Sequence, residues 1–243
     1  MEIAEDAEFE GKIAFLGGEP TLRDELPRWV RAAKAAAASW VLVQTNGRRL
    51  AYASYAGALA AAGVDAVEIA LAGSTAAMHE YHTGVPGSFS QTLLGIRHAR
   101  GLGLAVGVGV VVTRSNFRHL PEIVRLAAAQ GARSVRLAPA LPYGRAGRDW
   151  LRVVPEATMI APFLAAAERA GMLLGLREDE ALFAGLGPAD VDAQAAMEKD
   201  REARSMVPGR PTPAINEVHA QQKKTGENLR EIFPDLFAED KHG

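Results

Sequence analysis

The sequence contains no cysteine among its 243 residues. Disulfides, a thiolate zinc site and a cysteine-ligated iron–sulfur cluster are therefore excluded within this chain. The formal net charge is only −2, which gives no electrostatic footprint for nucleic acid. No apolar run is long enough to span a bilayer, and the acidic N-terminus lacks the features of a signal peptide. We expect a cytoplasmic protein that binds neither nucleic acid nor membrane.

Other metal-ligating residues are also sparse. His79 and His82 are three positions apart and could share one face of a helix, but no HExxH or comparable frame surrounds them. We predict no metal site.

What the chain does have is a regular alternation of apolar runs and segments with helical spacing. Strands are predicted at residues 12–17, 40–45, 66–72, 105–113 and 134–138. Helices are predicted at residues 22–38, 50–63, 89–101, 118–130 and 157–171, with a long loop at 73–88. Mostly apolar strands that alternate with helices indicate an α/β fold with a parallel sheet of about five strands.

The composition changes near residue 178, where charged and polar segments and a Pro/Gly-rich linker follow. We predict a first domain at residues 1–177 and a mostly helical or disordered tail at 178–243.

The two faces of the predicted strands differ in character. Successive side chains point to opposite faces of a strand. In three strands one face carries bulky aliphatic residues, while the other carries small residues and one polar group, namely Glu68, Thr113 or Arg136. The bulky face fits packing against helices, and the small face then leaves a cavity lined by the polar groups. A buried charge needs a partner or a ligand, so Glu68 and Arg136 either neutralise each other or bind a ligand.

A glycine-rich motif, Gly17-Gly18-Glu19-Pro20, directly follows the first predicted strand. Two glycines can adopt positive φ and let the backbone approach a ligand closely, and their N–H groups can bind an anion. Glu19 adds a carboxylate suited to an ammonium group. The alternative is an ordinary strand-to-helix turn in which Pro20 begins the helix.

This motif is the first in an ordered series that runs LGGEPTL, VQTNGRRL, VEIALAG, HEYHTGVPGSF, GVVVTRSNFRHLPEIV and VRLAPALPYGRA. The series covers roughly residues 12–146 and resembles the radical S-adenosylmethionine (SAM) superfamily. The resemblance implies a partial TIM-like (β/α) barrel with a SAM pocket at the carboxyl ends of its strands. The loop residues Gly17, Gly18, Glu19 and Pro20 would receive the amino group of SAM, and Glu68 would face its ribose or carboxylate.

The resemblance also implies roles at the ends of other strands. Thr45 and Asn46 would line the upper rim, while Asn116 and the backbone from Leu137 to Pro139 would lie by the adenine. Each position has a simpler interpretation. Asn46-Gly47 fits a left-handed turn, Asn116 fits a helix cap, and TGVPGSF fits a turn that enters a helix.

The sequence departs from the family at the cluster. Family members hold a [4Fe–4S] cluster with a CxxxCxxC motif upstream of GGEP, and this chain has no such motif. The chain would then be a truncated fragment of an enzyme, a degenerate homologue, or one half of a pair in which a second polypeptide supplies the missing first βα unit.

Three functions remain open at this point. The first is a radical-SAM-type domain with a residual SAM pocket, inactive alone because it cannot ligate a cluster. The second is a non-catalytic interaction or scaffold protein built on the barrel. The third is an unrelated α/β enzyme acting on a phosphorylated small molecule, in which GGEP is a fortuitous turn.

Overall fold

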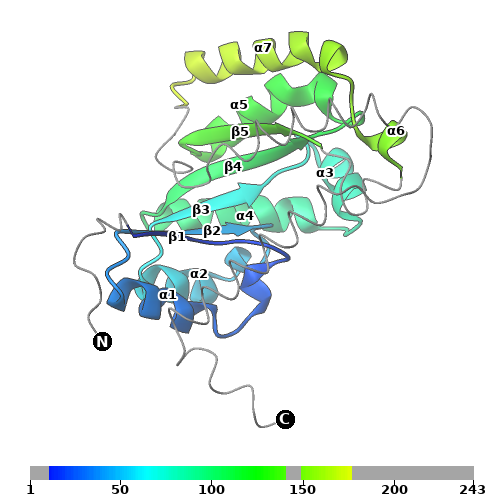
Figure 1. The fold of residues 1–243 in the computed structure, drawn as a ribbon. Coiled ribbons are helices and arrows are strands. Elements are labelled where there is room, and N and C mark those ends of the chain that lie inside the picture. The colour runs from blue at the N-terminus through cyan, green and yellow to red at the C-terminus, as the bar shows by residue number, and fades with distance from the viewer. Residues whose placement is uncertain (1–10, 141–148, 177–243) are drawn as a thin grey trace, which may run out of the picture. The chain divides into compact units, whose positions relative to one another are not determined.

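A single parallel sheet organises the fold in a computed structural model, which describes residues 11–140 and 149–176. Its five strands lie in chain order (Figure 1): β1 (Lys12–Phe15), β2 (Trp40–Thr45), β3 (Ala66–Ala70), β4 (Ala105–Val112) and β5 (Ser134–Pro139). Every neighbouring pair is parallel. The α/β partial-barrel architecture predicted from the sequence is confirmed.

Helices connect the strands. They are α1 (Leu26–Ala35), α2 (Ala53–Ala62), α3 (Ala76–Thr83), α4 (Ser88–Gly101), α5 (Leu120–Gln130), α6 (Trp150–Val153) and α7 (Ala157–Leu173). Three short 3₁₀ turns precede helices of this series: η1 (Pro20–Leu22), η2 (Arg49–Ala51) and η3 (Phe117–His119). α7 packs on α5 (Figure 1).

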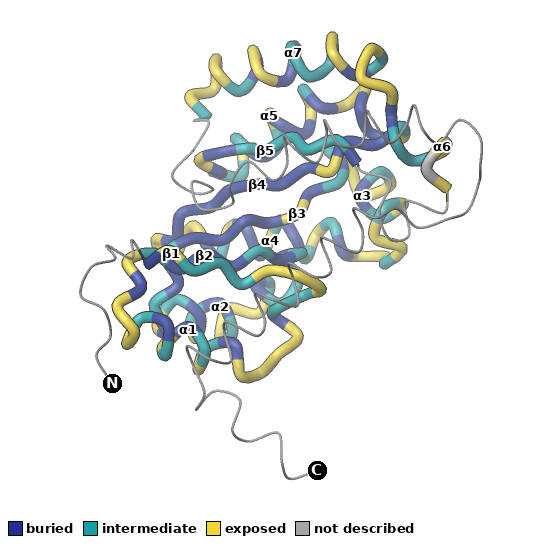
Figure 2. Tube along the Cα trace, viewed as in Figure 1, coloured by how far each residue is buried: buried dark blue, intermediate teal, exposed yellow. Residues whose placement is uncertain are grey.

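The main core lies between the sheet and its helices, as the alternation of strand residues predicts. The helix-facing valines and isoleucines of β2, β3 and β4 are fully or almost fully buried there, and so are apolar residues of α1, α2, α4 and α5. Figure 2 shows these strands dark blue, whereas many outward positions of the helices are exposed. Burying each such side chain contributes roughly 1.5–3 kcal/mol, and this anchors the sheet that positions the site.

Two predicted segments differ from the structure. The predicted loop at 73–88 contains α3, which begins after Thr75, whose hydroxyl accepts a hydrogen bond from the Met78 N–H. His79 is the one buried residue of α3, so the segment lacks an amphipathic pattern. The predicted helix at 22–38 begins later, at Leu26, because η1 first turns the chain.

Several predictions concern residues outside the described ranges. The boundary near residue 178 and the tail at 178–243 are among them. Within residues 11–140 and 149–176, no helix is both long enough and apolar enough to cross a membrane.

Candidate functional site

The glycine-rich loop begins two residues after β1 and has an open backbone. Gly17 and Gly18 have φ angles of +87° and +53°, a region that residues with a Cβ rarely adopt. A Cβ added at either position would have no atom within 4 Å beyond its immediate neighbours. The expected positive φ angles are confirmed, and both peptide groups are accessible.

Glu19 fastens this loop to the end of β2. Its carboxylate accepts hydrogen bonds from the Thr21 N–H at 3.1 Å and the Thr21 hydroxyl at 2.6 Å. It also accepts one from the Thr45 hydroxyl at 2.6 Å and one from the Asn46 N–H at 2.7 Å. Thr45 is buried, so its side chain faces Glu19 from inside the protein. The structure therefore brings the loop together with Thr45 and Asn46.

The Asn46-Gly47 segment is a left-handed turn, as the simpler interpretation predicted. Gly47 has a φ of +76°, and the Asn46 side-chain oxygen accepts a hydrogen bond from the Arg48 N–H at 2.9 Å. The turn packs closely on α4, because a Cβ on Gly95 would lie 2.2 Å from the Gly47 carbonyl oxygen. The sequence analysis did not single out Gly95.

Glu68 and Arg136 form an ion pair on the face of the sheet opposite the helix-facing core. Arg136 Nη2 donates to Glu68 Oε1 at 2.6 Å, and Nε donates to Oε2 at 3.3 Å. The Glu68 side chain is only 2% exposed, and it also accepts a bond of 2.9 Å from the Gln44 side-chain amide. Gly109 leaves the necessary room, since a Cβ there would lie 2.5 Å from Glu68 Oε1. Of the two alternatives left open by the sequence, the structure shows Glu68 and Arg136 paired with each other. The sequence did not indicate the parts played by Gln44 and Gly109.

Asn116 joins the ends of β3 and β4. Its side-chain amide donates to the carbonyls of Ala72 at 3.1 Å and Val111 at 2.9 Å. Its oxygen accepts from the Thr113 N–H at 2.8 Å and from the Thr113 hydroxyl at 3.2 Å. Asn116 occupies the N-cap position of η3, as one interpretation of the sequence had it, but its side chain makes no capping bond. Thr113 and Asn116 lie together, and both are buried.

A chain of hydroxyl groups extends from this corner to α3. The Thr113 hydroxyl donates to Asn116, so it accepts from Ser115, 2.9 Å away. The Ser115 hydroxyl then accepts from His82 Nε2, 3.0 Å away. Burial lowers the pKa of His82, which favours the neutral ring. The donation to Ser115 then requires the tautomer with its proton on Nε2. Because His82 donates to Ser115, this pair does not activate a serine nucleophile.

His79, the other histidine of α3, serves the structure. It is 2% exposed, and its Nδ1 accepts a hydrogen bond of 3.2 Å from the Ala72 N–H. Burial lowers the pKa of His79, as expected for a ring held neutral by an acceptor role. No group of three or more metal-ligating side chains occurs in the described part of the chain.

Leu137 lies on the other side of β5 from Arg136. Its side chain is partly buried against the helix-facing core. Only its backbone could contact a ligand on the opposite face, as the prediction for Leu137 to Pro139 required.

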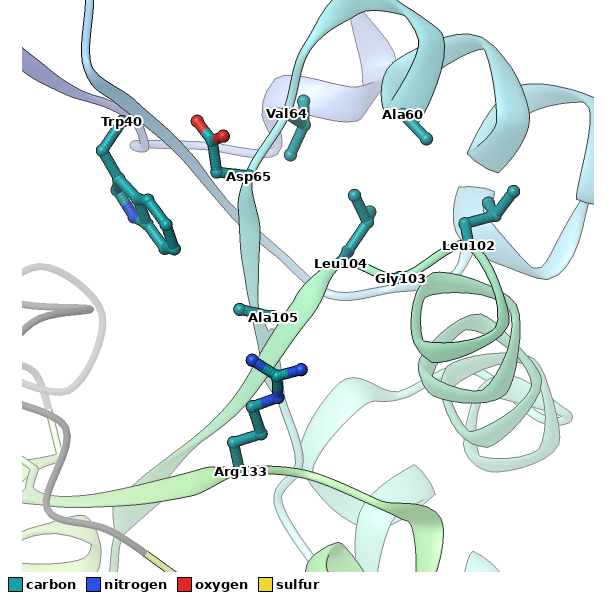
Figure 3. Close-up of a pocket in the computed structure, with 9 residues that line it drawn as sticks. All are labelled: Trp40, Ala60, Val64, Asp65, Leu102, Gly103, Leu104, Ala105 and Arg133. Atoms are coloured by element: carbon teal, nitrogen blue, oxygen red, sulfur yellow. The ribbon is translucent and has the colours of Figure 1, made fainter.

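A pocket of about 420 Å³ lies at the other end of the sheet. Figure 3 shows Trp40, Asp65, Ala105 and Arg133 around it, from the amino ends of β2, β3, β4 and β5. The Asp65 carboxylate there is bonded to Lys34 Nζ and the Val41 N–H, each at 2.6 Å. None of the predicted site residues lines this pocket, and ligands of parallel sheets bind at the carboxyl ends instead.

The sequence matches the family model of the Radical SAM superfamily over residues 1–127, more than half of the chain. The chain belongs to the radical SAM superfamily. It is 31% identical over 142 residues to an AdoMet-dependent heme synthase of Oleidesulfovibrio alaskensis, covering 58% of this chain and 36% of that protein. It is 33% identical over 163 residues to the PqqA peptide cyclase of Rhodopseudomonas palustris, covering 65% and 42%. The chain thus spans about two fifths or less of these relatives.

Solved structures agree on the radical SAM fold. A domain of pyruvate-formate lyase-activating enzyme from Bacteroides vulgatus superposes with a TM-score of 0.52 at 15% identity, covering 66% of this chain and 95% of that one. The structure of anSMEcpe with bound AdoMet and a Cp18Cys peptide gives a TM-score of 0.56 at 19% identity, covering 68% and 49%.

Radical SAM proteins use SAM and a [4Fe–4S] cluster, and only one of these fits the residues present. The chain has no thiolate, and its described residues hold no cluster of histidine and carboxylate ligands that could replace one. The cluster therefore does not fit this radical SAM chain. The open glycine loop and the polar face of the sheet, by contrast, are compatible with SAM.

Proposed function

We propose that this radical SAM domain binds SAM at the carboxyl ends of its strands and does not cleave it unaided. Two features together carry the proposal. The Gly17-Gly18 backbone is open and has positive φ angles, and the buried Glu68 is paired with the partly exposed Arg136 on the sheet face opposite the helix-facing core. The relative from Oleidesulfovibrio alaskensis is named for its dependence on AdoMet, and a neighbour of the same fold holds AdoMet, which supports the same ligand.

The predicted residues other than Pro20 each have a task in this proposal. The Gly17 and Gly18 peptide groups meet the amino group of SAM, and Glu19 holds that loop in place through Thr45 and Asn46. Glu68 is oriented by Arg136 and by the Gln44 amide, so that its carboxylate has a fixed position toward the ribose.

The corner at the end of β4 would bound the adenine side. Thr113 and Asn116 hold the β3 and β4 ends together, and the backbone from Leu137 to Pro139 supplies groups for the base. Thiolates for a cluster would have to come from outside these 243 residues, because they contain no cysteine.

Calorimetric titration with SAM tests the proposal. We expect a dissociation constant well below 1 mM. At a free SAM concentration of 100 times that constant, binding would stabilise the fold by about 2.7 kcal/mol. Gly18→Val should weaken binding at least about tenfold, because a β-branched residue is strained at positive φ. Gly103→Val is the matched control, since Gly103 has a φ of +82° and equal free space but precedes β4 at the opposite end.

Two results would contradict this function. Saturation only above 1 mM would favour the non-catalytic interaction protein. Cleavage of SAM by the chain alone, after incubation with iron, sulfide and a reductant, would overturn the statement that it is inactive unaided.

A further inference from the structure

A small cavity of about 220 Å³ lies on the flank of the glycine-rich loop. It is built where η1, the turn after β2, η2 and α4 meet, and it is lined by Glu19, Thr21, Leu22, Asn46, Arg48, Arg49, Tyr52 and Gln91. We call it the Arg48 cavity. Its volume is below the roughly 300–1,000 Å³ of sites that enclose whole ligands, so it suits one group of a ligand.

Arg48 is held in this cavity at one end of its guanidinium group. Its Nε donates to Gln91 Oε1 at 2.8 Å, and its backbone N–H donates to the Asn46 side chain at 2.9 Å. Within residues 11–140 and 149–176, the two terminal nitrogens of Arg48 have no partner. The fork that best recognises a carboxylate or phosphate is thereby fixed and open.

The hydrogen-bonding groups of the lining are unequally used. Its side-chain carbonyl acceptors are occupied, since Asn46 Oδ1 and Gln91 Oε1 both receive bonds from Arg48. The Glu19 carboxylate receives four bonds. The donors Asn46 Nδ2 and Gln91 Nε2 have no partner among the described residues. A lining with spare donors and occupied acceptors selects an acceptor-rich ligand.

The charges lead to the same conclusion. Arg49 is paired with Asp24 at 3.0 Å, and it also stacks on the Tyr55 ring at 4.2 Å. The negative charge of Glu19 is stabilised by its four donors. The partly buried guanidinium group of Arg48 makes no ion pair with a carboxylate of the described residues. A partly buried charge gains from a counter-ion.

We propose that the Arg48 cavity binds an anionic group, a carboxylate or a phosphate, that belongs to a ligand other than SAM. The group would accept hydrogen bonds from the terminal nitrogens of Arg48 and from the amides of Asn46 and Gln91. This site does not depend on SAM binding, although it shares Glu19 and Asn46 with the predicted SAM pocket.

The test is a titration of the full chain with inorganic phosphate and, separately, with acetate, in a low-salt buffer. We expect saturable binding at low millimolar concentration, and we expect Arg48→Met to weaken it at least about tenfold because a charge-assisted bidentate contact is lost. The anion affinity of Arg48→Lys should lie between those of the wild type and Arg48→Met, because lysine keeps the positive charge but lacks the two terminal nitrogens of the guanidinium group. A preference for phosphate or acetate identifies which anion the ligand carries.

Arg97→Met is the matched control. Arg97 also donates to a glutamine, with Nη1 3.2 Å from Gln130 Oε1, but it lies on the exposed side of α4. The dissociation constants of the Arg97→Met variant for phosphate and acetate should stay within about twofold of those of the wild type. Equal binding by Arg48→Met, or weakening by Arg97→Met to the same extent, would overturn the proposal.

A final arm separates this site from the SAM pocket. Phosphate binding should be unchanged in the presence of saturating SAM, and Arg48→Met should retain SAM binding. Competition between phosphate and SAM would overturn the proposal, because the cavity would then be part of the SAM pocket. If SAM does not bind at all, the titration without SAM still decides the matter.

Discussion

At the scale of single residues, the Glu68 cluster shows what strand alternation can and cannot predict. Alternation alone placed Glu68 and Arg136 on one face, and the structure joins them at 2.6 Å. Gln44 and Gly109 complete the cluster through the register between strands, where Gln44 lies beside Glu68 and Gly109 lies beside Arg136. Register depends on contacts between distant segments, so one sequence does not reveal it.

Arg136→Met tests how much Glu68 depends on its partner. The change leaves a carboxylate that is 2% exposed with the Gln44 amide as its remaining donor. We expect a loss of about 3 kcal/mol in the free energy of unfolding, at the low end for a broken buried pair, because the Arg136 side chain is 34% exposed. Urea denaturation measures it.

A double variant provides the check on that interpretation. Glu68→Gln in the Arg136→Met background removes the uncompensated charge and should recover most of the loss. Arg133→Met, an exposed neighbour in the chain, should change stability by less than about 0.5 kcal/mol. If the double variant is no more stable than Arg136→Met, the loss does not arise from the buried carboxylate.

At the scale of elements, the contact between α4 and the turn after β2 decides where the rim of the site lies. Gly95→Ala should lower stability by about 1–3 kcal/mol, because the new methyl group would overlap the Gly47 carbonyl. Thermal denaturation monitors the change, and weaker SAM binding should accompany it if the turn moves.

Gly57→Ala is the counterpart in α2. A Cβ at Gly57 meets no atom within 4 Å, so the alanine should stabilise the helix by about 0.5–1 kcal/mol. Stabilisation by Gly95→Ala as well would contradict the close contact.

The elements were predicted better than their ends. All five strands were predicted, since apolar runs of this kind mark buried parallel strands. The α3 helix was missed because one buried histidine gives no periodic signal. For Asn116 the sequence offered a place beside the adenine or a helix cap. It could not predict that the Asn116 amide bonds to both Ala72 and Val111, because Ala72 lies in a segment that is distant in the chain.

At the scale of the whole molecule, the buried histidines predict how stability varies with pH. Burial lowers the pKa of His79 in the folded state below its ordinary value of 6.5. The unfolded state then binds more protons between the two pKa values, so stability rises with pH through that window. The stability that the neutral His79 contributes is fully present above about pH 6.5 and is lost as the pH falls below that value. Unfolding free energies between pH 5 and 8 measure the effect.

His79→Asn separates this contribution from the rest of the molecule. The asparagine oxygen can accept the Ala72 N–H in place of Nδ1, and it does not titrate between pH 5 and 8. The slope of stability against pH should therefore become smaller, whatever the absolute stability of the variant. An unchanged slope would show that His79 does not contribute to it.

The order of the strands has a consequence for how the chain folds during synthesis. Among the five strands that the structure describes, each pairs with its neighbours in the sequence, in the order β1 to β5. No strand emerging from the ribosome has to wait for a distant later segment, so the sheet can grow outwards from one edge by one βα step at a time. A pause in translation after any helix would leave a shorter sheet whose existing pairings are already native.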